Sequence, residues 1–210
     1  MRRITKGREP GALAAYRVSP GGTWEGFREK EQVLNELIRT QRKVCCYCGR
    51  RVDPDTAHVE HFHPQRGDHG RPDLQLRWSN LWAACPGGRG LSARLQHCDT
   101  RKGDQPCHLD PATIDEGPVW FGADGSVHHA DRELDRELND VLGLNVASLT
   151  EQRTAALTGW LQAFRRKHPG EWTREVLQRE HDRIRDRDPA DPFNAVLLAT
   201  IRRKLDRLAR

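Results

Sequence analysis

Hydrophobic residues recur at helical spacing in two parts of the chain. Between residues 24 and 43 they follow one another at three- and four-residue steps, as on one face of a helix. Those positions are Phe27, Val33 or Leu34, Leu37 and Ile38. From Ala130 onward the spacing is helical again and predicts helices near 131–142, 148–167, 171–186 and 193–208. The last of them carries an apolar face formed by Val196, Leu197, Ile201, Leu205 and Leu208.

The breaks between these C-terminal helices come from turn-forming and capping residues. Pro169 and Gly170 separate the second helix from the third, and the proline-containing stretch 189–192 separates the third from the fourth. Asn145 and Ser148 are candidate caps for the second helix, because both side chains offer an oxygen to the free backbone N–H groups of a first turn.

The middle of the chain, residues 44–108, shows little regular periodicity. It holds all six cysteines and six of the ten histidines, and glycine and proline are frequent there. Such a segment is typical of a region held together by a metal ion. Residues 1–23, before it, are rich in turn residues. After it, Val119–Phe121 followed by Asp124-Gly125 predicts a small hairpin.

Composition limits the class of protein. The 210 residues suggest one domain, or a compact core with an appended lobe. Charged residues make up 31% and hydrophobic residues 36%, with a mean hydropathy of −0.83. No apolar run approaches the roughly 20 residues that a membrane-spanning helix needs, and the N-terminal residues do not form a signal peptide pattern. The composition therefore argues against a membrane or exported protein and predicts a cytoplasmic one.

The basic charge is concentrated in the cysteine-rich half. The formal net charge is +5, and residues 1–99 carry 17 Lys/Arg against 11 Asp/Glu, whereas residues 100–210 carry 18 against 19. A basic excess beside a metal-binding region is expected where a protein binds a phosphate backbone. A solvated, arginine-rich surface would produce the same charge pattern, so charge alone leaves both interpretations open.

The cysteine spacing predicts a structural zinc site. Cys45 and Cys48 form a C-x-x-C pair that can grip one tetrahedral ion from one side. Cys85 and Cys98 are the candidate second pair, and Cys107 or His97 could replace one of these two. Cys46 is interpreted as a small apolar residue. A redox pair has the same C-x-x-C spacing, but the βαβ pattern that a redox fold requires does not surround Cys45 and Cys48.

A candidate catalytic segment lies between the two cysteine pairs. Residues 58–64 resemble the second strand of a hairpin ended by Pro64, and they contain Glu60 next to His61. Phosphodiester hydrolysis needs a base for water and oxygen ligands for a hard cation. His61 can supply the base, and Glu60 and Asp99 can supply the oxygens that Mg²⁺ prefers. Strict strand alternation would place Glu60 and His61 on opposite faces, so they meet only if the backbone bends.

Taken together in their order, these motifs resemble the HNH (His-Me finger) endonucleases with a zinc-stapled ββα-metal core. The resemblance is closer still to the HNH nuclease subunit of Septu-type anti-phage systems, which is also found with retrons. The matching positions run along most of the chain: Ile4-x-Lys6-Gly7-x-Glu9-Pro10, Gln41 with Cys45-x-Tyr47-Cys48, Val59-Glu60-His61-Phe62-x-Pro64, Trp78-x-Asn80-Leu81 with Cys85, His97-Cys98-Asp99-x-x-Lys102-Gly103-Asp104, Phe121 with Asp124-Gly125, and Leu142-x-Leu144-Asn145 with Leu149 and Arg153.

The resemblance implies a role for each matching residue. His61 would be the general base, and Glu60 and Asp99 would hold a catalytic Mg²⁺ or Mn²⁺ ion. Asn80 would brace the loop that carries His61, and Arg101 and Lys102 would contact phosphate. The products would carry 5′-phosphate and 3′-hydroxyl ends. Glu60 stands where the family usually has Asp, and Asp99 where it commonly has His or Asn, but both keep an oxygen ligand.

The resemblance also implies an architecture and a partner. The expected fold is α+β and mainly helical, with an N-terminal arm and helix (1–43), an HNH core with its zinc site (44–128) and a C-terminal helical lobe (129–210). An ABC/SMC-like ATPase subunit would gate or position the nuclease, and the C-terminal helices would be its docking surface. DNA is the favoured substrate and RNA the alternative. A zinc-stapled binding or assembly module without catalysis is the competing interpretation.

Overall fold

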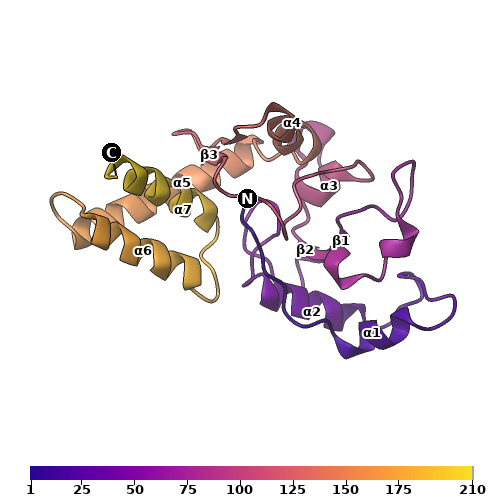
Figure 1. Ribbon diagram of the computed structural model, residues 1–210. Coiled ribbons are helices and arrows are strands. Elements are labelled where there is room, and N and C mark those ends of the chain that lie inside the picture. The colour runs from indigo at the N-terminus through magenta and orange to yellow at the C-terminus, as the bar shows by residue number, and fades with distance from the viewer. Residues whose placement is uncertain (210) are drawn as a thin grey trace.

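The computed structural model describes residues 1–209, which form an α+β fold of helices and two small sheets. Figure 1 shows α5, α6 and α7 at one side of the molecule, and α1 and α2 at the other, beside β1 and β2. The helices are α1 (Gly11–Arg17), α2 (Lys30–Thr40), α3 (Cys98–Lys102), α4 (Arg132–Arg136), α5 (Ala147–Lys167), α6 (Arg174–Asp186) and α7 (Asn194–Arg207). The strands are β1 (His58–His61), β2 (Leu81–Ala84), β3 (Val119–Phe121) and β4 (Val127–His129).

The N-terminal helix α2 is shorter than its hydrophobic pattern predicts. It begins at Lys30 rather than Trp24, because the Trp24 backbone N–H donates to the side-chain oxygen of Gln75 (2.9 Å) and holds residues 24–26 in a turn. The predicted face is buried at Val33, Leu37 and Ile38. Helix α1 was not predicted within the turn-rich arm; it follows Pro10 and buries Leu13. The end of α2 is tied to β2, since the Gln41 side chain pairs with both backbone groups of Ala83 (2.7 and 2.8 Å).

The central sheet consists of β1 and β2, which run antiparallel with Glu60 opposite Trp82 and His61 opposite Leu81. The expectation that residues 58–64 form the second strand of a hairpin is therefore wrong. Residues 58–61 form the first strand of the pair, and their partner β2 follows after a long loop. No strand precedes them among the described residues, because residues 44 and 51 make only an isolated bridge. All four residues of β2 are buried, so this strand anchors the site to the core.

The predicted hairpin is present as β3 and β4, with Phe121 opposite Val127. Arg153 of α5 is buried and binds the hairpin turn, donating to the Gly125 carbonyl at 2.6 Å. Asn145 holds the other side of the hairpin by pairing with the backbone N–H and carbonyl of Val127 (2.7 and 2.9 Å). The predicted cap function of Asn145 and Ser148 is therefore wrong, and α5 begins at Ala147 without a side-chain cap.

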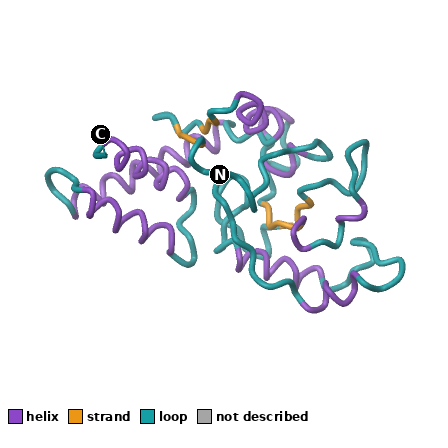
Figure 2. Tube along the Cα trace, viewed as in Figure 1, coloured by secondary structure: helices purple, strands orange, loops and turns teal. Residues whose placement is uncertain are grey.

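The C-terminal helices follow the predicted pattern closely, with α6 packed along α7 (Figure 2). Two details differ. The helix expected near 131–142 is the short α4 followed by a π-helical turn at Glu137–Val141. Leu208, expected on the buried face of α7, is exposed because the helix ends at Arg207. None of the helices in the described part of the chain is long and apolar enough to cross a membrane.

Candidate active site and metal centre

Four cysteines from three separate segments meet in one buried cluster. Cys45 and Cys48 follow α2, Cys85 follows β2, and Cys98 is the first residue of α3. The Sγ atoms are separated by 3.9 Å between Cys45 and Cys98, 3.7 Å between Cys48 and Cys85, and 3.8 Å between Cys85 and Cys98. Four sulfurs at the usual zinc bond length of about 2.3 Å stand about 3.8 Å apart. The cluster therefore fits a tetrahedral metal ion such as zinc.

The alternative ligands lie outside this cluster. His97 is buried and directs its Nδ1 at the Cys98 Sγ atom (3.1 Å), while the Cys107 thiol contacts Glu137 (3.5 Å). The wide spacing before Cys98 is accommodated at Gly87, which has a φ of 59°; a Cβ atom there would lie 2.1 Å from the His97 carbonyl oxygen. Glycine at this position lets the loop close tightly enough for Cys85 and Cys98 to meet.

The chemistry of the thiols also suits a cation. Burial raises the pKa of Cys98 well above its usual range. Burial acts in the same direction on Cys45, but hydrogen bonds from its cysteine neighbours outweigh it and lower the pKa of this thiol well below its usual value. A thiolate surrounded by buried sulfur atoms is a ligand for a metal ion, since only the deprotonated form coordinates.

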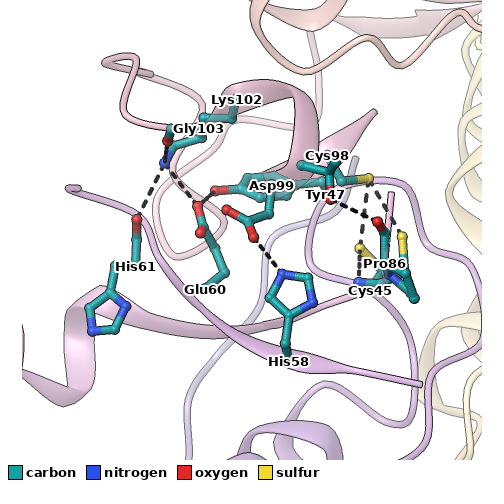
Figure 3. A network of polar contacts seen from close by, with 12 residues as sticks. Cys45, Tyr47, His58, Glu60, His61, Pro86, Cys98, Asp99, Lys102 and Gly103 are labelled. Carbon is teal, nitrogen blue, oxygen red and sulfur yellow. Dashed lines mark hydrogen bonds and ion pairs between the residues drawn. The ribbon is translucent and has the colours of Figure 1, made fainter. Parts of the chain in front are cut away.

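Beside the cysteine cluster, Glu60 and Asp99 approach each other from β1 and α3, as Figure 3 shows. The Glu60 Oε1 atom accepts from the Tyr47 hydroxyl (2.7 Å) and pairs with the Lys102 ammonium (2.9 Å). The Asp99 Oδ2 atom contacts the Nε2 atom of His58. Two carboxylates and an imidazole therefore share one partly buried site between the strand and the helix.

The charges in this site are strongly coupled to each other. Burial, followed by the neighbouring Asp99, raises the pKa of Glu60 well above its usual range. Asp99 is partly buried, which raises its pKa, yet its contacts with Glu60 and His58 outweigh this effect and lower the pKa to about 2. Two adjacent carboxylates repel each other unless a proton or a cation lies between them. The geometry therefore favours binding of a positive ion at Glu60 and Asp99.

His61 is held on the other side of the strand end. Its Nε2 atom lies 3.0 Å from the Gln75 carbonyl oxygen, and its Nδ1 atom lies 3.1 Å from the Gln65 side-chain amide. Trp24 packs against the ring at 78° with a centroid distance of 5.1 Å. Burial lowers the pKa of His61 to about 4, so the imidazole is neutral near pH 7. Because a carbonyl only accepts, Nε2 carries the hydrogen and Nδ1 keeps the lone pair.

Glu60 and His61 point in different directions, as strand alternation predicts (Figure 3). Both nevertheless line the same groove. This groove has a volume of about 700 Å³, and Asp99 also lines it. No sharp bend of the strand is needed, since the open end of β1 exposes both sides to the groove. The structure thus brings the candidate base and the two candidate ion ligands to one surface.

Asn80 connects the two ends of the loop between β1 and β2. Its Oδ1 atom accepts from the His63 backbone N–H (2.7 Å), and its Nδ2 atom donates to the carbonyls of His63 (3.1 Å) and Leu74 (3.3 Å). The loop also supplies Gln75, whose carbonyl orients His61. Asn80 therefore supports the segment on which the orientation of His61 depends.

Replacing Asn80 with alanine is expected to destabilise the fold by about 1–3 kcal/mol, because it removes a buried amide that pairs with backbone groups of His63 and Leu74. The measurement is the free energy of unfolding in urea. Asn35→Ala, at an exposed position of α2, is the matched control and is expected to change the free energy by less than about 0.5 kcal/mol. Equal effects of both substitutions would contradict the bracing role.

The side chains of the two residues expected to contact phosphate bind other groups of the protein instead. Lys102 is 1% exposed, and its ammonium faces Glu60 and the His61 carbonyl (3.3 Å) rather than the groove. Arg101 donates to the carbonyls of Asp140 (3.0 Å) and Ala93 (3.1 Å). The expected phosphate contact of Lys102 is therefore corrected: it balances the charge of Glu60, since a buried ammonium needs a carboxylate partner.

Two residues that sequence reasoning did not place in the site belong to it. His58 contacts Asp99, and Tyr47 donates to Glu60. A signal for His58 was present, because it precedes Glu60 by two positions on a strand and so shares its face. No comparable local signal pointed to Tyr47, whose contact depends on the packing of the cysteine loop against β1.

A buried imidazole beside a pair of carboxylates, on two antiparallel strands and a short helix held by four cysteines, is the arrangement that the HNH resemblance implies. No family model matches the chain. Two curated proteins are similar to it, and both are named as HNH endonucleases. The resemblance to this class that the motifs predict is thereby confirmed.

The first relative is the Escherichia coli protein named "Retron Ec83 putative HNH endonuclease", 35% identical over 119 residues, which are 49% of this chain and 46% of the relative. The second is the Vibrio cholerae serotype O1 biovar El Tor protein named "Retron Vc95 putative HNH endonuclease", 27% identical over 135 residues, 60% of this chain and 64% of the relative. The chain thus spans about half the length of the first relative and under two thirds of the second.

Proposed function

We propose that this chain is a metal-dependent HNH endonuclease that hydrolyses phosphodiester bonds, with DNA as the favoured substrate. The observation that carries the proposal is the neutral His61 imidazole, oriented by Gln75 and bordering the same groove as Glu60 and Asp99. A base and a carboxylate pair beside one groove are the groups that hydrolysis of a phosphodiester requires. The similarity to two proteins named as retron HNH endonucleases supports the same activity.

In this mechanism His61 takes a proton from the attacking water at Nδ1. The Gln75 carbonyl keeps the hydrogen on Nε2, so the lone pair stays on the nitrogen that faces Gln65. Burial keeps the imidazole neutral at working pH, which preserves this lone pair. The Gln65 amide donates to Nδ1 in this structure, so it would have to move aside for the attacking water to reach this nitrogen.

Glu60 and Asp99 would hold the catalytic Mg²⁺ or Mn²⁺ ion, with His58 as a nitrogen donor next to them. A bound divalent ion stabilises the charge that develops on the phosphate and the leaving oxygen. Tyr47 and Lys102 orient Glu60 by binding its Oε1 atom, which leaves the other carboxylate oxygen free for the ion. The structural zinc would be held by the four-cysteine cluster.

His58→Ala is expected to weaken Mn²⁺ binding about 10–100-fold, because it removes the group that contacts Asp99 and a nitrogen donor to the ion. The measurement is a titration that follows the signal of free Mn²⁺ by electron paramagnetic resonance. His69→Ala, at an exposed position between β1 and β2, is the control and should bind Mn²⁺ like the wild type. Unchanged Mn²⁺ affinity in His58→Ala would remove His58 from the site.

The division into an N-terminal arm (1–43), a ββα-metal nuclease core (44–128) and a C-terminal lobe (129–210) is part of the proposal. A role in anti-phage defence of the Septu type, in the cytoplasm, is also part of the proposal. The names of the two relatives, both retron proteins, support its link to retrons. An ABC/SMC-like ATPase is the proposed partner. The C-terminal lobe is its proposed docking surface, since this lobe contributes none of the residues of the candidate site.

The proposal is tested by incubating the protein with supercoiled plasmid and with total RNA, each with added Mg²⁺ or Mn²⁺. We expect nicking or linearisation of the plasmid, with product ends that carry a 5′-phosphate and a 3′-hydroxyl. Cleavage of RNA alone would support the alternative substrate of the same fold. If neither is cleaved, alone or with an ATPase partner, the non-catalytic zinc module is the better interpretation.

A further inference from the structure

Another cavity borders the cysteine loop and shares no lining residue with the groove at Glu60 and His61. It has a volume of about 220 Å³ and is enclosed by the N-terminal arm, the end of α2 and the start of α7. Three arginines and no acidic residue line it: Arg2, Arg3 and Arg42. Cys45 and Cys48 also line it, but their sulfur atoms meet Cys85 and Cys98, which do not.

Three buried side-chain atoms in this wall have no partner among the described residues: the Thr40 hydroxyl oxygen and two nitrogen donors. The Asn194 side chain is 2% exposed, and its Nδ2 atom is buried without a hydrogen bond. The Nε atom of Arg2 is also buried and has no hydrogen-bond partner. A buried donor without an acceptor costs free energy, so such groups usually face a ligand or an ordered water. All three atoms belong to residues that line this cavity.

Carboxylates outside the cavity lining balance only part of this positive charge. Asp186 acts on Arg42 and Arg2 without lining the cavity. Glu116 is the carboxylate that raises the pKa of Arg2 most. It already pairs with the Arg202 guanidinium (2.7 Å) and accepts from the Arg3 backbone N–H (2.8 Å). Arg42 donates to a backbone carbonyl, that of Arg185 (2.7 Å). Burial lowers the pKa of Arg2, and repulsion by Arg42 adds to this effect. An anion between the two guanidinium groups would relieve this repulsion.

Helix α7 starts at the same wall. Asn194 and Ala195 are its first residues and line the cavity, and no side chain caps its N-terminus. The positive end of the helix dipole therefore adds to the field of the arginines. Guanidinium groups, a free amide donor and an uncapped helix N-terminus are the donors that bind phosphate in proteins.

We infer that this cavity is a binding site for a phosphate group, presented by a nucleotide or by the end of a nucleic-acid strand. The apolar side chains of Ile4 and Val44 in its lining suit the sugar or base attached to that phosphate. The site is separate from the proposed nuclease centre, and its occupant would be an effector rather than the scissile strand. Tyr47 links the two, since it lines the cavity while its hydroxyl donates to Glu60 (2.7 Å).

The site is tested by calorimetric titration without added divalent ions. The probes are inorganic phosphate, AMP, and a short DNA strand with and without a 5′-phosphate. We expect saturable binding of at least one phosphate probe, and binding reduced at least about tenfold in Arg2→Gln/Arg42→Gln. Arg165→Gln/Arg203→Gln removes the same charge at exposed positions and should bind like the wild type. Binding of AMP indicates a free nucleotide; binding of only the 5′-phosphorylated strand indicates a strand end.

A second variant guards against misfolding of the double substitution. Asn194→Asp keeps the shape of the side chain and places a negative charge beside the arginines and the helix N-terminus. We expect it to raise the melting temperature while it lowers phosphate affinity at least about tenfold, because its carboxylate takes the place of the anion. Asn35→Asp is the control at an exposed site. If no probe binds the wild type, or if binding persists in Asn194→Asp, the assignment is overturned, whatever the cleavage assays show.

Discussion

Replacing His61 with alanine is expected to lower the rate of plasmid cleavage by about 10²–10⁴-fold, the usual contribution of a general base. The substitution removes the Nδ1 lone pair that the Gln75 contact preserves and leaves Glu60 and Asp99 in place. Mn²⁺ affinity and zinc content should therefore stay near the wild-type values. The measurement is the initial rate of supercoiled plasmid loss at saturating Mg²⁺ or Mn²⁺, with RNA as a parallel substrate.

The control for His61→Ala is His63→Ala, two positions further on and exposed. It should keep most of the activity, because its side chain does not reach the groove lining. His61 also packs against Trp24, so the melting temperatures of both variants are compared before the rates are interpreted. Cleavage at the wild-type rate by His61→Ala would assign the base to another residue or the activity to a contaminant.

Removing the structural metal is expected to unfold the core of the protein. Zinc binding to comparable cysteine sites contributes about 10–16 kcal/mol. That is as large as the whole free energy of unfolding of a typical domain, about 5–15 kcal/mol. Cys98→Ser removes one of the four thiols of the cluster. Cys98 is also the first residue of α3, so the metal would no longer hold the helix that carries Asp99. We expect loss of the bound zinc and loss of the cooperative thermal transition, measured by metal analysis and circular dichroism.

Cys107→Ser is the matched control for this experiment. Cys107 is also buried, but its thiol contacts Glu137 and lies outside the four-cysteine cluster. It should retain one zinc per chain and unfold in one cooperative transition. A Cys98→Ser protein with full zinc content and an unchanged melting temperature would contradict the assignment of this ligand.

The two experiments separate the competing interpretations only in combination. A nuclease and a non-catalytic zinc module would both unfold when the metal is lost, because in both the metal contributes to folding. They differ at His61, where only the nuclease loses a measurable activity. A protein that depends on zinc and yet cleaves nothing under any condition would be a binding or assembly module.

Part of this molecule follows from local sequence. The helix predicted at 148–167 matches α5 within a residue, since its limits depend on nearby turn residues and on the spacing of apolar side chains. The ligand set Cys45, Cys48, Cys85 and Cys98 was also predictable, because thiol chemistry restricts the candidates to six residues and one pair has a recognisable spacing. Glu60, His61 and Asp99 were proposed from their residue types and the order of the motifs around them, and all three line one groove.

The remaining features were decided by tertiary structure. Lys102 turns inward to Glu60 because a buried carboxylate needs a cation, and nothing next to Lys102 in the sequence indicates that direction. Asn145 binds Val127 instead of capping α5, because the hairpin brings two unpaired backbone groups within its reach. The order of the amino acids alone establishes which chemical groups are present and where regular helices form. Only packing between distant segments determined which groups meet, because those contacts depend on burial and charge balance in three dimensions.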